Sequence, residues 1–195
     1  MADTLFGYAG KILEVDLTTH STKTVEVTPD LAKKYLGGVG FAAHFLWSRV
    51  KPGTDPLGPD NLLMFMTGPM TGTGASGTRW SAAFKSPHTG AWAQTAMGGD
   101  IGPELKYAGW DGIVIEGKAD RPVWVNIIND KVTIEDAGEL WRQLVDTAQA
   151  EIWRRVTGRS DCSPVERNHR RPYFALNRGS HEVCASHFPH SSSTS

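Results

Sequence analysis

Apolar and polar positions alternate over the first part of the chain in a pattern typical of a β-hairpin. The alternation runs over residues 11–17, breaks at a Thr-Thr-His-Ser turn, and resumes over residues 22–27. Thr28-Pro29 then has the form of a helix N-cap followed by proline at the first helical position. We therefore expect a short helix from this point to Leu36, ended by Gly37-Gly38.

Continuous apolar runs within residues 62–66 and 112–116 predict two buried strands. A long amphipathic helix is expected over residues 139–156, where apolar residues recur at steps of four. These residues are Leu140, Leu144, Ala148 and Ile152. The remaining expected elements are helices at 41–50 and 103–108, strands at 80–84 and 91–93, and a hairpin of 123–128 with 131–135. Many short strands with a few helices predict an α+β class that is rich in β-sheet.

The composition changes abruptly near residue 157. All seven Trp and every Lys lie before this point, whereas both Cys and eight Ser lie in residues 158–195. We therefore divide the chain into a domain over residues 1–157 and a tail over residues 158–195. Two interpretations of the tail stay open, a disordered C-terminal segment and out-of-frame translation after about Val156, which would also explain the abruptness.

Charge and cysteine content exclude several classes of protein. The formal net charge is -1 and no long run has one sign, which argues against a nucleic-acid partner. No stretch approaches the roughly 18 apolar residues of a membrane span, and the first residues lack the pattern of a signal peptide. The two cysteines, Cys162 and Cys184, form no disulfide framework. We expect a cytoplasmic protein with no membrane partner.

Glycine is concentrated between Gly37 and Gly117, where 16 of the 21 glycines lie. The densest cluster occupies residues 67–79 and ends in Arg79, and a second cluster is Met97-Gly98-Gly99. Exposed backbone N–H groups beside one guanidinium make an anion cradle, and the planar fork of arginine can hold a phosphate or an electron-rich heterocycle. Tight β-turns without any ligand would explain the glycines equally well.

Two short motifs match nucleotide-binding patterns in letters only. Gly72–Gly77 fits G-x-G-x-x-G, but a strand is expected next, where the dinucleotide fold requires a helix. No acidic residue stands about 20 positions further on to hold a ribose. The segment 112–118 resembles a P-loop, but its middle residues are apolar and β-branched, and Ala119 replaces the hydroxyl that would bind Mg²⁺.

The sequence offers no complete catalytic constellation. Four carboxylates near the glycine-rich turns could act as acids or bases, but solvated loop or helix-cap positions are the more common explanation. They are Asp100, Glu104, Asp111 and Glu116. The cysteines and the tail histidines lack the paired spacing of a zinc site. We therefore assign no catalytic residue and no metal ligand from the residue pattern.

A series of glycine-rich blocks extends over about residues 7–156. The blocks are 10–19, 36–40, 55–61, 67–73, 79, 85–90, 98–99, 102–112, 115–118 and 136–141. In order and content they resemble the N-terminal domain of the aldehyde:ferredoxin oxidoreductase family, whose members are tungsten or molybdenum bis-pyranopterin enzymes. Several ordered blocks make this resemblance far more specific than either short motif.

The resemblance implies a base of β-sheets that carries the bis-pyranopterin, whose dithiolene sulfurs chelate the metal without needing a protein ligand. It implies that Arg79 lies between the pterin and a [4Fe–4S] cluster, and that the Gly98 backbone contacts the pterin. Met97 and Gly99 join these two as expected cofactor-binding residues. The implied activity is oxidation of a small aldehyde to a carboxylic acid. Electrons would pass to ferredoxin or to an iron–sulfur electron-transfer subunit.

The chain departs from the family pattern in three ways. Ala96 stands where typical members carry Asn, so the segment 96–99 is closer to the tungsten subunit of class II benzoyl-coenzyme A reductases. Residues 74–77 are one residue shorter than the common form. The chain also ends before the cluster-binding cysteines, so we expect a truncated, incomplete fold without activity of its own. A non-catalytic domain that binds a nucleotide in the glycine cradle is the remaining alternative. Choice of metal, substrate and oligomeric state stay open.

Overall fold

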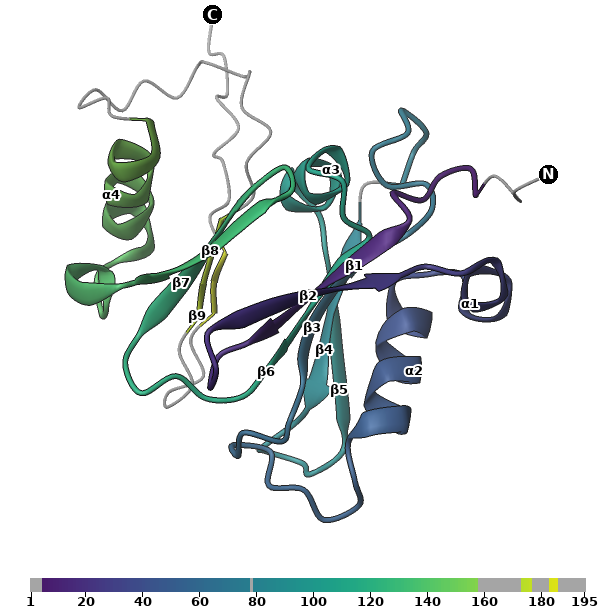
Figure 1. The fold of residues 1–195 in the computed structure, drawn as a ribbon, viewed down its shortest axis with the longest axis horizontal. Helices are drawn as coiled ribbons and strands as arrows, with labels where there is room; N and C mark the ends of the chain where they lie inside the picture. The colour runs from purple at the N-terminus through teal and green to yellow at the C-terminus, as the bar shows by residue number, and fades with distance from the viewer. Residues whose placement is uncertain (1–4, 78, 158–172, 177–182, 186–195) are drawn as a thin grey trace, which may run out of the picture.

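A computed structural model describes residues 5–77, 79–157, 173–176 and 183–185 (Figure 1). Its main sheet has the strand order β2-β1-β6-β3-β4-β5. The strands are β1 (Lys11–Asp16), β2 (Ser21–Glu26), β3 (Leu63–Thr67), β4 (Trp80–Lys85), β5 (Trp92–Met97) and β6 (Gly112–Glu116). A second sheet has the order β10-β9-β7-β8. Its strands are β7 (Val123–Ile128), β8 (Lys131–Asp136), β9 (Tyr173–Leu176) and β10 (Val183–Ala185).

The helices are short and surround the two sheets. They are α1 (Pro29–Tyr35), α2 (Val39–Arg49), α3 (Ile101–Tyr107), the 3₁₀-helix η1 (Gly138–Leu140) and α4 (Val145–Thr157). As the sequence predicts, Thr28 caps α1, because its hydroxyl accepts a hydrogen bond from the Leu31 N–H at 3.2 Å. The mixed strands and helices confirm the predicted α+β class.

Both faces of the central strands of the main sheet are buried, while the edge strands β2 and β5 are largely exposed. On one face, α2 packs over β3 and β4 and forms a cluster with residues such as Phe41 and Met64 (Figure 1). On the other face, residues such as Leu13 and Ile113 pack against Val125 of the second sheet. Burial on both faces explains the continuous apolar runs of β3 and β6, because neither strand has a solvated side.

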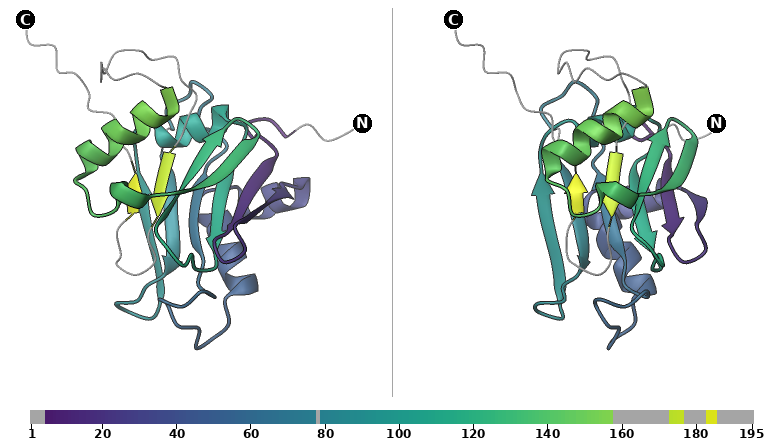
Figure 2. Two further views of the ribbon diagram at one scale, coloured as in Figure 1. Left: turned by 60° about the vertical axis from the view of Figure 1, so that its left-hand side comes forward. Right: turned by 90° about the vertical axis from the view of Figure 1, so that its left-hand side faces the viewer.

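The second sheet lies between the main sheet and α4, as the views in Figure 2 show. Successive side chains of a strand point to opposite faces, so Val123 and Val125 face the main sheet while Trp124 packs with Ile152 of α4. The described part of the chain therefore forms layers in the order α2, main sheet, second sheet and α4.

The prediction of one long helix over residues 139–156 is wrong. The segment is divided into η1 and α4, with Leu144 between them at 80% exposure. Arg142 has a φ of 64°, a left-handed conformation that no α-helix contains. The four-residue spacing of the apolar residues therefore continued by coincidence across a turn. Leu140 and Ile152 are nevertheless both buried, as expected.

The two interpretations of residues 158–195 fall largely outside the described residues. Within that segment the structure describes only β9 and β10, and β9 pairs antiparallel with β7. Cys184 lies on β10, and Cys162 lies outside the described residues. The nature of the tail therefore stays a prediction.

Candidate functional site

Three strand ends meet at one end of the main sheet. Thr67, the last residue of β3, is paired with Trp80, the first residue of β4, and Trp80 is paired with Met97, the last residue of β5. The turn before α2 joins them, because the Gly38 N–H donates to the Thr67 carbonyl at 2.9 Å. This arrangement brings the two glycine clusters predicted from the sequence, together with Arg79, to the same edge of the fold.

The loop from residue 68 to residue 79 borders a cavity of about 650 Å³, within the range of roughly 300–1,000 Å³ typical of small-molecule sites. The lining residues are Gly68, Pro69, Met70, Thr71, Ser76, Gly77 and Arg79. Thr71 is buried and ties the loop together, because its hydroxyl accepts from the Gly68 N–H and donates to the Arg79 carbonyl, both at 3.2 Å. The loop is therefore held by the protein itself.

Several hydrogen-bond donors of this loop have no acceptor in the described part of the chain. The Arg79 side chain is exposed and makes no ion pair or hydrogen bond with a described residue. The backbone N–H groups of Ser76 and Gly77, which line the cavity, likewise have no acceptor among the described residues, nor do those of Gly72, Gly74 and Ala75 in the same loop. Gly72 and Gly74 have φ of 77° and 82°, a conformation that glycine adopts without strain. A guanidinium beside several free N–H groups favours an anionic or electron-rich ligand.

The second glycine cluster lies beside this loop but outside the lining of the cavity. Met97 is partly buried against the core cluster, and the Gly98 carbonyl accepts a hydrogen bond from the Trp80 indole at 3.1 Å. A Cβ added at Gly98 would meet nothing within 4 Å, so a ligand could approach the backbone here. Gly99 has a φ of 82°. The four predicted residues thus share one strand end, but only Arg79 borders the cavity.

Of the four candidate acids and bases, Asp111 clearly departs from the solvated position expected. Its side chain is 1% exposed, and its carboxylate accepts from the N–H groups of Ala9 and Gly10 at 3.0 and 2.7 Å. It also forms an ion pair with Lys106, which is 7% exposed and donates to the Gly7 carbonyl at 2.6 Å. Asp111 is therefore a structural group, and sequence spacing gave no signal for its partners.

This buried pair supports the loop at the cavity from behind. It fixes the turn at Gly7, where an added Cβ would lie 2.5 Å from the Pro69 carbonyl oxygen. Tyr8 in the same turn donates to the Leu36 carbonyl at 2.7 Å. Burial, followed by the nearby negative charge of Asp111, raises the pKa of the Tyr8 hydroxyl above its ordinary value.

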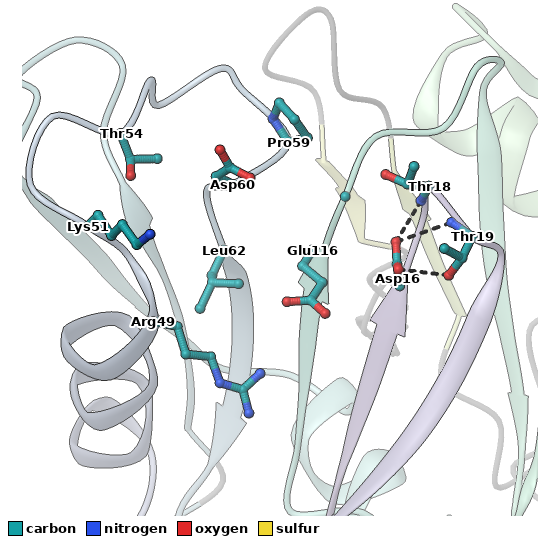
Figure 3. Close-up of a pocket in the computed structure, with 11 residues that line it drawn as sticks. Asp16, Thr18, Thr19, Arg49, Lys51, Thr54, Pro59, Asp60, Leu62 and Glu116 are labelled. Carbon is teal, nitrogen blue, oxygen red and sulfur yellow. Dashed lines mark hydrogen bonds between the residues drawn. The ribbon is translucent and has the colours of Figure 1, made fainter.

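A second cavity of about 430 Å³ lies at the opposite end of the sheet (Figure 3). Its charged groups include Asp16, Arg49 and Glu116. Asp16 already accepts from the Thr19 hydroxyl at 2.7 Å, which is the largest cause of its lowered pKa, and Arg49 forms an ion pair with Glu14. Glu116 is the one candidate acid or base that lies here. Because two of the charges have partners within the protein and none of the four expected cofactor-binding residues lies here, the first cavity is the better candidate.

Among the residues the structure describes, no group of three His, Cys, Asp or Glu side chains is placed to hold a metal ion. Nor does the described part of the chain contain a helix that is long and apolar enough to cross a membrane. The remaining candidate carboxylate at the site end, Asp100, is exposed and precedes α3 without capping it through its side chain. Donors, rather than metal ligands or acids, therefore dominate the site.

Comparison with known proteins gives consistent matches. The family described as "Aldehyde ferredoxin oxidoreductase, N-terminal domain" matches residues 12–165. The tungsten-containing aldehyde ferredoxin oxidoreductase of Pyrococcus abyssi is 46% identical over 149 residues, which cover 76% of this chain and 24% of that protein. The WOR-like subunit of an aliphatic sulfonate oxidoreductase from Pyrococcus furiosus is 42% identical over 140 residues, which cover 70% and 22%.

Among solved structures, the active site complex BamBC of benzoyl coenzyme A reductase with 1,5-dienoyl-CoA is similar to this chain. The TM-score is 0.75 and the sequence identity 41%, over 77% of this chain and 23% of that one. The chain therefore spans about a quarter of the length of the relatives it matches. Those relatives are named for different substrates, so similarity alone leaves the substrate undecided.

Proposed function

Because the chain belongs to the aldehyde ferredoxin oxidoreductase family, we propose that it forms the cofactor-binding N-terminal part of a tungsten or molybdenum pterin oxidoreductase. The observation that carries this proposal is the set of donors in the loop before β4, with Arg79 at its end, that have no acceptor in the part of the chain that the structure describes. Relatives named as tungsten-containing proteins support the choice of cofactor. A cytoplasmic location remains an expectation.

The residues at the strand ends fit a flat, anionic pterin cofactor. Arg79 would hold it by the guanidinium, and the loop N–H groups would bind its electronegative atoms. Gly98 and Gly99, next to Met97, would let the cofactor lie directly against the backbone, since open space surrounds the missing Cβ of Gly98. The described residues provide no ligand cluster for a metal, and the sulfurs of such a cofactor would supply the ligands. Once bound, the metal would supply two-electron redox chemistry.

The reaction proposed for the whole protein is aldehyde oxidation. An aldehyde and water give a carboxylic acid, two protons and two electrons, and the electrons leave one at a time through a [4Fe–4S] cluster. Ferredoxin or an iron–sulfur subunit would accept them. In this chain the role of Arg79 is to neutralise negative charge at the edge of the cofactor and to keep the cofactor in one orientation. The chain alone is expected to be inactive.

Reduction of an aromatic acyl-coenzyme A is the second candidate reaction. It is favoured by Ala96, which stands where typical aldehyde-oxidising members carry Asn, and by the similarity to the BamBC structure. Both reactions require the same cofactor site, so they differ only in the walls that complete the substrate pocket. A nucleotide-binding domain without catalysis is a third candidate, supported only by the glycine content.

A chimera tests the proposal. Residues 1–157 of this chain would replace the matching N-terminal segment of the Pyrococcus abyssi enzyme, with the unmodified enzyme as the control. We expect tungsten and pterin in stoichiometric amounts and reduction of a viologen dye by aldehydes. Dye oxidation driven by benzoyl-coenzyme A would favour the second reaction instead. A folded chimera that contains neither tungsten nor pterin would refute the proposal.

The nucleotide alternative needs a separate measurement on the 195-residue chain. Binding of a ligand to the folded state raises its melting temperature by mass action. Stabilisation by NAD⁺ or ATP, and loss of that effect in Arg79→Ala, would favour the nucleotide-binding domain over the pterin site. An unchanged melting temperature at millimolar nucleotide would count against it.

A further inference from the structure

The indole of Trp80 holds one end of the peptide group that joins Gly98 to Gly99. Its Nε1–H donates to the Gly98 carbonyl at 3.1 Å. We propose that Trp80 is a positioning residue, which fixes this peptide so that the Gly99 N–H is presented to the cofactor. The inference rests on the proposed function. It adds Trp80 to the site, a residue that neither the composition of the chain nor its glycine clusters indicated.

Trp80 itself cannot move, because the core holds it. Its side chain is 3% exposed and packs against Phe65, with ring centroids 5.5 Å apart. Its backbone is paired with Thr67 on one side and Met97 on the other. A buried ring between two paired strands has one available orientation, so the direction of its N–H is set by the fold.

A trans peptide group is planar, and its C=O and N–H bonds point in opposite directions. The described residues contain no cis peptide bond. Since the Gly98 carbonyl points to the Trp80 indole, the Gly99 N–H points away from Trp80 and therefore away from the core cluster to which Trp80 belongs. One hydrogen bond inside the protein thus determines the direction of a donor on the outside.

The peptide between Gly98 and Gly99 has few restraints of its own. A glycine on each side removes the Cβ contacts that normally limit rotation of a peptide group. Gly99 lies beyond the end of β5, so no strand partner orients it. Its N–H has no acceptor among the described residues, and a backbone donor without a partner is costly unless a ligand or solvent accepts from it.

The same core cluster contains a matched control. Trp110 is also 3% exposed, and its Nε1–H donates to a backbone carbonyl, that of Asn129, at 3.0 Å. Asn129 lies between β7 and β8, in a turn that belongs to the second sheet. Substitution of either tryptophan by phenylalanine removes one indole hydrogen bond and the same ring area, but only Trp80→Phe releases the Gly98 peptide.

The first test uses nuclear magnetic resonance on the 195-residue chain. Relaxation dispersion detects exchange between conformations on the microsecond to millisecond timescale. We expect dispersion at the Gly99 amide in Trp80→Phe, and none at this amide in the parent chain or in Trp110→Phe. If Trp80→Phe does not fold, the benzothiophene analogue of tryptophan, which keeps the ring shape and lacks the N–H, replaces it.

The second test measures cofactor retention in the chimera with the Pyrococcus abyssi enzyme. After matched gel filtration, Trp80→Phe should retain tungsten about fivefold less tightly than Trp110→Phe, the effect of one hydrogen bond of ordinary strength. The melting temperatures of the apo-proteins should fall by similar amounts in both variants. If the role of Trp80 were purely structural, Trp80→Phe would lower the melting temperature, but the two variants would retain tungsten equally well.

The outcomes separate this inference from the proposed function. A parent chimera without tungsten refutes the proposed function, while the dispersion experiment still reports whether Trp80 orients the peptide. A Gly99 amide without dispersion in Trp80→Phe overturns the positioning role. Equal tungsten retention in Trp80→Phe and Trp110→Phe overturns it as well.

Discussion

Replacing Asp111 by alanine should destabilise the fold more than any surface change. The substitution leaves Lys106 with a buried, unpaired charge and removes the acceptor of the Ala9 and Gly10 N–H groups. Breaking a buried ion pair from one side costs about 3–5 kcal/mol. A domain is stable by only about 5–15 kcal/mol, so this one change would remove roughly a fifth or more of the free energy of unfolding.

Urea unfolding of the 195-residue chain would measure this loss. With a slope of about 2 kcal/mol/M, the midpoint for Asp111→Ala should fall by roughly 1.5–2.5 M. Asp136→Ala is the matched control, because Asp136 pairs with Arg121 at 3.0 Å on the surface, where the two side chains are 47% and 65% exposed. An exposed pair of this kind is worth about 0–1 kcal/mol, a shift of at most about 0.5 M.

A double-mutant cycle identifies the cause of the effect. Lys106→Met removes the buried charge, so adding it to Asp111→Ala should recover part of the lost stability. The reasoning is refuted if Asp111→Ala shifts the midpoint no more than Asp136→Ala does. It is also refuted if the two substitutions at positions 106 and 111 are simply additive, because independent sites carry no coupling.

Four further predictions concern single positions. Arg79→Ala should lower tungsten retention in the chimera without changing the urea midpoint, because the side chain is exposed and has no partner among the described residues. An equal loss of tungsten in Arg121→Ala would contradict this prediction. Gly112→Ala should destabilise by about 1–3 kcal/mol, measured by the same urea titration, since its Cβ would lie 2.3 Å from the Met66 sulfur and 2.9 Å from a carbonyl oxygen of β3. Gly98→Ala, with nothing within 4 Å, should leave the midpoint unchanged and lower tungsten retention. Hydrogen bonds from Arg154 and then Arg155 lower the pKa of Glu151 to about 2. A lowered folded-state pKa gives stability above the unfolded value that is lost on acidification, and the contribution of this pair is small because it is exposed to solvent. Circular dichroism should therefore show a slight loss of helical signal between about pH 4.5 and 2, and Glu151→Gln should remove this dependence.

Elements with local causes were predictable from the sequence. The first hairpin follows from alternation, and the start of α1 follows from Thr28-Pro29, because both depend on residues a few positions apart. The failure at α4 has the same origin. A spacing of four residues predicts a helix whether or not a turn interrupts it. The positive φ of Arg142, which interrupts the helix here, does not change that spacing.

The contacts that build the site join residues far apart in sequence. Asp111 accepts from residues 101 and 102 positions earlier, and no local pattern indicates such a partner. The predicted strand at residues 80–84 is present as β4, but the pattern that predicts it says nothing about the carbonyl that the Trp80 indole binds. Glycine clustering located the candidate site, whereas the register of β3, β4 and β5 was needed to bring its parts together.

Buried side chains orient parts of the candidate site. Thr71 holds the loop between Gly68 and Arg79, and Trp80 holds the Gly98 carbonyl, while both side chains are at most 3% exposed. A site ordered in advance loses little conformational entropy when it binds. The N–H groups without an acceptor among the described residues, together with the exposed guanidinium, would then bind a ligand without a prior rearrangement. Through Thr71 and Trp80, the core of the main sheet would therefore be part of the proposed binding site.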